Sequence, residues 1–109
     1  MSKWHSFQYR EFWDQPRILY TSDGEQSFLF DCPFDEQLDG YSESYNVYLM
    51  PQLDSSDLSG SWAGLEQRAL RLLGTINVPI SAFDPSRRTQ IDLGILSRLV
   101  PAQGARDAP

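Results

Sequence analysis

The sequence predicts an α+β fold, in which a small antiparallel or mixed sheet of about five strands carries two helices packed on it. Three observations predict this. Short runs rich in aromatic and aliphatic residues, separated by turn-forming residues, occupy much of the first 50 positions, whereas apolar residues recur at helical spacing after Trp62 and again after Leu93. The predicted order is β-β-β-β-α-β-α. At 109 residues the chain has the size of one domain, which we place at 1–100, followed by a frayed tail at 101–109.

The first half of the chain predicts four strands. They are bounded by proline or by runs of turn-forming residues, and they lie at 7–13, 17–21, 26–31 and 45–50. The dipeptide Asp23-Gly24 between the second and third runs is a strong signal for a two-residue hairpin turn. Such a turn would place Leu19 opposite Phe28 and Ile18 opposite Leu29. Because these two pairs fall on opposite faces, we expect both faces of this hairpin to be covered.

The second half predicts the two helices and the fifth strand. Ser61 is a candidate N-cap for a helix over 62–73, and Gly74 is a candidate left-handed residue at its end. The alternation over 75–83 predicts a strand, which Pro79 marks as an edge strand. A second helix is expected over 93–100, preceded by a Thr89–Asp92 capping pair and stopped by Pro101.

The charge distribution argues against nucleic acid and membrane partners. The net charge is −6, and residues 1–60 alone carry three basic residues against eleven acidic ones, a balance of −8. Binding to phosphates needs clustered Lys and Arg instead. No apolar run approaches the length of a membrane span. The single cysteine, Cys32, rules out an intramolecular disulfide and is typical of a reducing compartment, so we expect a cytoplasmic protein.

The side chains available for catalysis are few, and the sequence predicts no enzyme and no cofactor. Gly60-Ser61-Trp62-Ala63-Gly64 resembles a nucleophile elbow but has serine second rather than third. One Cys and one His cannot supply the ligands of a zinc site. Acidic residues at 31, 35, 36 and 39 leave a hard cation open, and a small enzyme that uses carboxylates or a Cys32–His5 pair remains an alternative.

An acidic and aromatic surface is the remaining candidate site. Acidic side chains that surround aromatic anchors suit a basic protein partner, because Tyr and Trp bury a large area at low entropic cost. The candidate binding residues are Trp13, Asp31, Phe34, Asp35, Glu36, Asp39, Tyr41 and Glu43. The sequence therefore predicts a non-enzymatic protein-binding module, with self-association as another use of the same surface.

In bulk character, a small acidic α+β chain without a cofactor is similar to the bacterial immunity proteins, which cover basic toxin surfaces with acidic ones. That resemblance implies an inhibitor that neutralises a basic partner. It rests on overall charge and size and assigns no particular residue.

Overall fold

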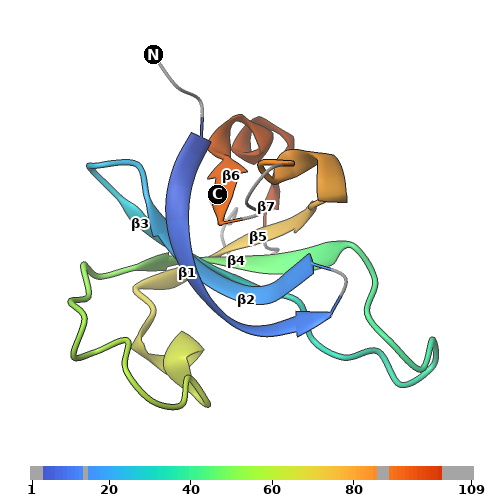
Figure 1. Cartoon of the computed structure of the whole chain (residues 1–109), viewed down its shortest axis with the longest axis horizontal. Coiled ribbons are helices and arrows are strands. Elements are labelled where there is room, and N and C mark those ends of the chain that lie inside the picture. Colours follow the sequence, from blue (N-terminus) through green and yellow to red (C-terminus); the bar gives the residue numbers. More distant parts are fainter. Residues whose placement is uncertain (1–3, 14, 86–88, 102–109) are drawn as a thin grey trace, which may run out of the picture.

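A computed structural model describes residues 4–13, 15–85 and 89–101. They form one antiparallel sheet of seven strands in the order β6-β1-β2-β3-β4-β5-β7 (Figure 1). The strands are β1 (Trp4–Trp13), β2 (Gln15–Ser22), β3 (Ser27–Asp31), β4 (Ser44–Met50), β5 (Arg71–Asn77), β6 (Gln90–Asp92) and β7 (Val100–Pro101).

The predicted α+β class is wrong, because the two expected α-helices are absent from the described residues. The helical segments found there are three short 3₁₀ helices, η1 (Leu65–Arg68), η2 (Ile80–Ala82) and η3 (Leu93–Arg98). The fold is therefore almost entirely β, with seven strands rather than about five.

The helix predicted over 62–73 fails for a backbone reason and a pairing reason. Gly64 has a φ of +79°, which interrupts any α-helix that starts at Ser61. After the single turn of η1, the N–H of Leu70 donates to the carbonyl of Leu49, and β5 begins at Arg71. Residues 71–73, which the apolar periodicity assigned to a helix, thus belong to a strand, because β5 pairs with β4. Only the start of the predicted apolar stripe packs inward: Trp62 and Leu65 are buried, whereas Leu72 is 38% exposed.

The helix predicted over 93–100 is the short η3, because the apolar spacing there fits two periods. Leu93, Leu96 and Leu99 recur every third residue, which aligns them on one side of a 3₁₀ helix as well as near one side of an α-helix. Asp92 caps this helix directly: its Oδ1 accepts from the N–H of Gly94 at 2.9 Å.

Four of the predicted strands are present, with shifted bounds. The hairpin of β2 and β3 is also present, but its loop has four residues, and Ser22 pairs with Ser27. Leu19 therefore lies opposite Phe30 rather than Phe28. The fifth strand runs over 71–77 instead of 75–83, and Pro79 lies beyond its end.

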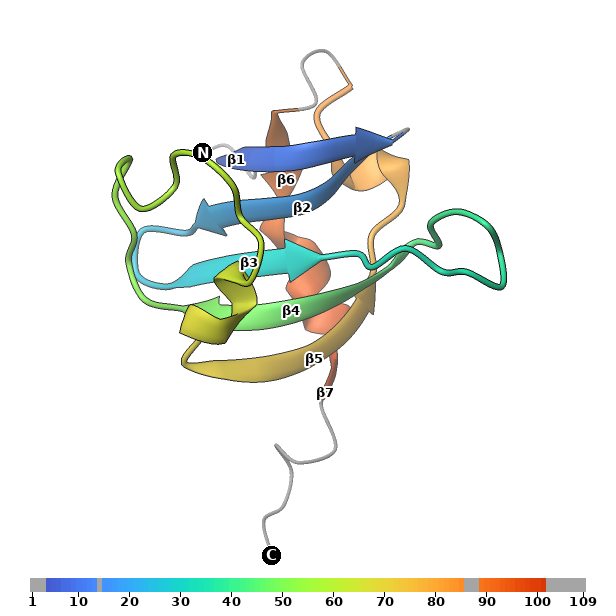
Figure 2. The same ribbon diagram turned by 90° about the horizontal axis from the view of Figure 1, so that it is seen from below.

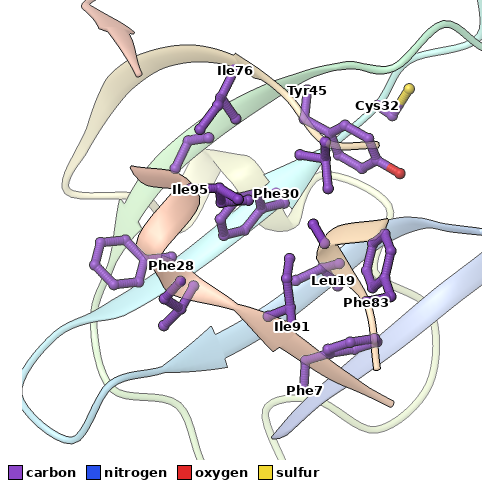
Figure 3. Close-up of a cluster of buried hydrophobic side chains, with 14 residues drawn as sticks. Phe7, Leu19, Phe28, Phe30, Cys32, Tyr45, Ile76, Phe83, Ile91 and Ile95 are labelled. Carbon is purple, nitrogen blue, oxygen red and sulfur yellow. The ribbon is translucent and has the colours of Figure 1, made fainter. Parts of the chain in front are cut away.

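Both faces of the central hairpin are covered, as predicted. One face carries a cluster that includes Phe7, Leu19, Phe30 and Val47, and side chains of η2, β6 and η3, together with Phe83, pack on it (Figure 3). The opposite face carries Tyr20, Leu29 and Met50 under the connection between β4 and β5. We call this connection, residues 51–70, the cover segment. Figure 2 shows η1 of the cover segment in front of β3 and β4, with η3 behind them.

The stretch from β6 through η3 to β7, residues 90–101, joins the two edges of the sheet. β6 pairs with the outer side of β1, and β7, which follows η3 directly, pairs with the outer side of β5. At the second junction Gly74 lies opposite Pro101, and a Cβ on Gly74 would come within 2.1 Å of the Val100 carbonyl oxygen. Only glycine fits this approach.

Residues 102–109 of the predicted tail lie outside the described residues, while Pro101 belongs to β7. Among the described residues, no helix has the length and apolar content that would let it cross a bilayer.

Candidate functional site

The cover segment leaves part of its sheet face open, and a hollow of about 440 Å³ lies there. Its sheet side is formed by Arg10, Ile18 and Asp31, which are cross-strand neighbours on β1, β2 and β3. Its other side is formed by the cover segment around Trp62 and Glu66. We call this the inner hollow.

Arg10 fixes the cover segment at this position. Its guanidinium carbon lies 4.7 Å from the centre of the Trp62 ring. Nε donates to the Gly60 carbonyl at 3.1 Å, and one terminal nitrogen donates to the Leu58 carbonyl at 2.8 Å. The same cation thus combines a stacking contact with charge-assisted hydrogen bonds, which hold the wall of the inner hollow against β1.

The inner hollow holds more negative than positive charge. The carboxylates of Glu11, Asp31 and Glu66 line it together with the single guanidinium of Arg10. Glu11 has a φ of +64°, a conformation that costs free energy for a residue with a Cβ. Within the described residues, none of the three carboxylates belongs to an ion pair.

The electrostatics of Asp31 reflect this crowding. Burial is the main cause that raises the pKa of its carboxyl above the ordinary value, and the negative charges of Glu66 and Glu11 raise it further. The same environment raises the pKa of the Tyr48 hydroxyl, through burial first and then through Asp31 and Glu66. A cation placed in the inner hollow would be attracted by all three carboxylates.

A second hollow, of about 490 Å³, lies at the base of the loop between β3 and β4. Phe34, Asp35 and Glu36 line it from the loop, while Ser44 and Asn46 line it from β4. We call this the outer hollow. Figure 2 shows the loop projecting beyond the ends of β3 and β4.

The two hollows adjoin on one face of the sheet. Asp31, which lines the inner hollow, is paired across the ladder with Asn46, which lines the outer hollow. Directly paired residues of antiparallel strands point to the same face. We call the two hollows together the acidic trough, whose lining includes the acidic residues Glu11, Asp31, Asp35, Glu36 and Glu66.

The structure brings together some of the predicted binding residues and separates others. Four of them line the trough: Asp31, Phe34, Asp35 and Glu36. Asp39, with a φ of +53°, and the exposed Glu43 line neither hollow. Tyr41 packs its ring 5.0 Å from the guanidinium carbon of Arg17. Trp13 ends β1 opposite Gln15, and its side chain lies outside the described part of the chain.

Phe34 and Leu38 both lie in solvent, with 51% and 60% of their surfaces exposed. The loop that carries them is closed by a bridge between Asp35 and Gly40. The apolar side chains of this loop therefore face solvent.

A buried polar group lies on the opposite face, around Arg17. One terminal nitrogen of Arg17 donates to the Ser42 carbonyl at 2.8 Å and contacts the Cys32 sulfur at 3.7 Å. Burial raises the pKa of the Cys32 thiol, although Arg17 opposes this shift. Neither Cys32 nor His5 lines the acidic trough, so the alternative catalytic pair is not placed with its carboxylates.

Three contributors to the trough were missed from sequence: Arg10, Glu11 and Glu66. They come from β1 and η1, which are far from Asp31 along the chain, and only the sheet register and the packed cover segment bring them to it.

Within the residues described, no group of three or more His, Cys, Asp or Glu side chains is arranged to hold a metal ion. Searches against protein-family models, curated proteins and solved structures find no significant match to this chain.

Proposed function

We propose that this protein is a cytoplasmic, non-enzymatic binding module that takes a basic segment of a protein partner into the acidic trough. The observation that carries the proposal is the set of five carboxylates on two adjoining hollows, none of them in an ion pair with another described residue. Such a surface attracts Lys and Arg side chains and repels polyanions.

The shape of the site favours a peptide segment over a single small cation. The carboxylates are distributed along two hollows of about 440 and 490 Å³ instead of converging on one point. Ile18 and Trp62 line the inner hollow as well, and they provide apolar contact for the aliphatic stem of a basic side chain. A Lys or Arg side chain thus matches both the charge and the lining.

Fluorescence anisotropy with a labelled nonapeptide that carries Lys at alternate positions tests the proposal. We expect E66Q and D31N each to weaken binding by about three- to tenfold, because each removes one attractive charge from a partly enclosed site. The matched control is E25Q, which removes an exposed carboxylate outside the trough and should leave binding unchanged. Equal losses for E25Q and E66Q would mean that only net charge matters, and the proposal would be wrong.

A further inference from the structure

Two large apolar side chains lie in solvent on the loop that borders the trough. Phe34 is 51% exposed and Leu38 is 60% exposed. Phe34 also lines the outer hollow, next to Asp35 and Glu36. Covering such side chains with a partner removes apolar surface from water, which favours association.

The loop is held in one shape by contacts at its base and across its turn. The N–H of Asp35 donates to the Gly40 carbonyl at 2.7 Å, and the N–H of Gly40 donates back at 3.2 Å. The Phe34 ring meets the Tyr41 ring edge-on, with 5.4 Å between their centres. Tyr41 in turn packs on the buried Arg17. A loop braced in this way loses little conformational entropy when it binds.

We infer that the segment bound in the trough pairs its basic side chains with a neighbouring apolar side chain, and that this apolar side chain docks on Phe34 and Leu38. The inference rests on the proposed function and specifies its partner. Charge complementarity supports it: Asp35, Glu36 and Asp39 belong to the same loop as the apolar pair, so a partner that covers the pair also meets negative charge.

A selection from a library of random linear dodecapeptides tests the inference. The wild-type chain and the F34S and L38S variants are each immobilised and used to select peptides from the same library. Leu38 has no ring contact to lose, so L38S keeps the test valid even if F34S disturbs the packing of Tyr41. The matched control is L70S, which changes a similarly exposed leucine, 64% exposed, outside the trough.

On the wild type and on L70S we expect peptides enriched both in Lys or Arg and in a neighbouring apolar residue. On F34S and L38S the basic enrichment should persist while the apolar enrichment is lost. Basic peptides with the same apolar enrichment on all four proteins would overturn the inference but leave the proposed function intact. Selected peptides without basic enrichment would overturn the proposed function, and the inference with it.

The salt dependence of binding separates the two contributions. For a peptide selected on the wild type, L38S should lower the affinity about three- to tenfold while the dependence on salt concentration stays the same, because no charge is lost. D35N should instead reduce the salt dependence. A change in salt dependence for L38S would contradict an apolar role for Leu38.

Discussion

The guanidinium of Arg10 lies over the indole of Trp62, 4.7 Å from the ring centre, and so joins the first strand to the segment that covers the sheet. Trp62 belongs to the buried cluster that also contains Tyr20, Leu29 and Met50. The contact also sets the position of the inner hollow, because Arg10 and Trp62 both line it. Stability and the candidate site thus depend on the same side chain.

Replacing Arg10 by alanine should destabilise the fold and loosen the cover segment. The carbonyls of Leu58 and Gly60 would lose their side-chain donor, and Trp62 would lose its stacked cation. We expect the free energy of unfolding to fall by about 1–3 kcal/mol in denaturant titrations. Amide hydrogen exchange should accelerate over 58–66. R71A, which removes an exposed arginine, is the control; equal effects of the two variants would contradict this role for Arg10.

Substituting Gly74 by alanine should disrupt the junction between β5 and β7. The added Cβ would lie 2.1 Å from the Val100 carbonyl oxygen and 2.9 Å from Pro101 Cα, and the φ of Gly74 is +152°. We expect a loss of about 1–3 kcal/mol in the free energy of unfolding, because the backbone of β7 must move. Gly40→Ala is the control, since its nearest neighbour would lie at 3.9 Å and its φ is not positive. If G74A were as stable as G40A, the close approach of β7 would be disproved.

Neutralising Asp31 should stabilise the fold at neutral pH. Its folded-state pKa is raised above 3.8, so the folded chain holds this proton more tightly than the unfolded chain does. The contribution of Asp31 to the free energy of unfolding of the wild type therefore rises as the pH falls from the raised folded-state pKa towards the ordinary value of 3.8. D31N should be more stable than the wild type at neutral pH, and its advantage should vanish in acid. The same change should weaken peptide binding, a conflict between stability and function.

Thermal unfolding at neutral and at acid pH measures the effect of D31N, and D23N is the comparison variant for which the opposite sign is expected. The backbone N–H groups of Gln26 and Glu25 donate to the Asp23 carboxylate and lower its pKa. That stabilisation is present above the ordinary pKa and is lost as the pH falls through the folded-state value. D23N should thus be less stable than the wild type at neutral pH. A destabilised D31N would show that Asp31 makes a favourable contact in the folded chain instead.

The hydroxyl of Tyr45 should resist ionisation. It donates to the Pro16 carbonyl and accepts from Gln15 Nε2 at 2.9 Å, and burial raises its pKa to about 12. Absorbance titration should show the Tyr45 hydroxyl still protonated at about pH 11 in the folded chain. Because the folded-state pKa is the higher one, this group makes the fold less stable as the pH rises from its ordinary value of 10.0 to about 12.

Y45F tests the same hydroxyl at neutral pH. The Gln15 amide and the Pro16 carbonyl would each lose a buried partner, at a cost of about 1–3 kcal/mol in the free energy of unfolding. Y9F is the control, because Tyr9 is 38% exposed, and its effect should stay within about 0.5 kcal/mol. Similar unfolding midpoints for the two variants would show that the Tyr45 hydroxyl contributes little.

Elements of the fold that depend on neighbouring residues were predictable from the sequence, whereas elements that depend on distant strands were not. The hairpin around Asp23-Gly24 and its two strands were predictable because the signal lies within a few residues, although the predicted two-residue loop and its register were wrong. The strand conformation of Arg71 and Leu72 was not predictable, because it depends on pairing with Leu49 and Tyr48 of a distant strand. Leu93, Leu96 and Leu99 fit both helical periods over so short a stretch, so their spacing could not identify the 3₁₀ helix.

The candidate site divides in the same way. Asp31, Phe34, Asp35 and Glu36 were identified because they form a visible acidic and aromatic run in the sequence. Glu66 was not identified, because nothing near it in the chain indicates that η1 packs over β3. The sequence therefore predicted the residues that the β3–β4 region contributes to the trough but not the residue that the cover segment contributes.

The stretch that joins both sheet edges has a consequence for biosynthesis. Trp4–Ser6, which leave the ribosome before the other described residues, pair with Gln90–Asp92, and β5 pairs with Val100 and Pro101, which leave it last among them. A nascent polypeptide that has emerged only to residue 89 would hold five strands with both flanks bare, a state open to proteases and to strand exchange with its neighbours. Protease resistance should therefore appear abruptly, once Pro101 has cleared the exit tunnel.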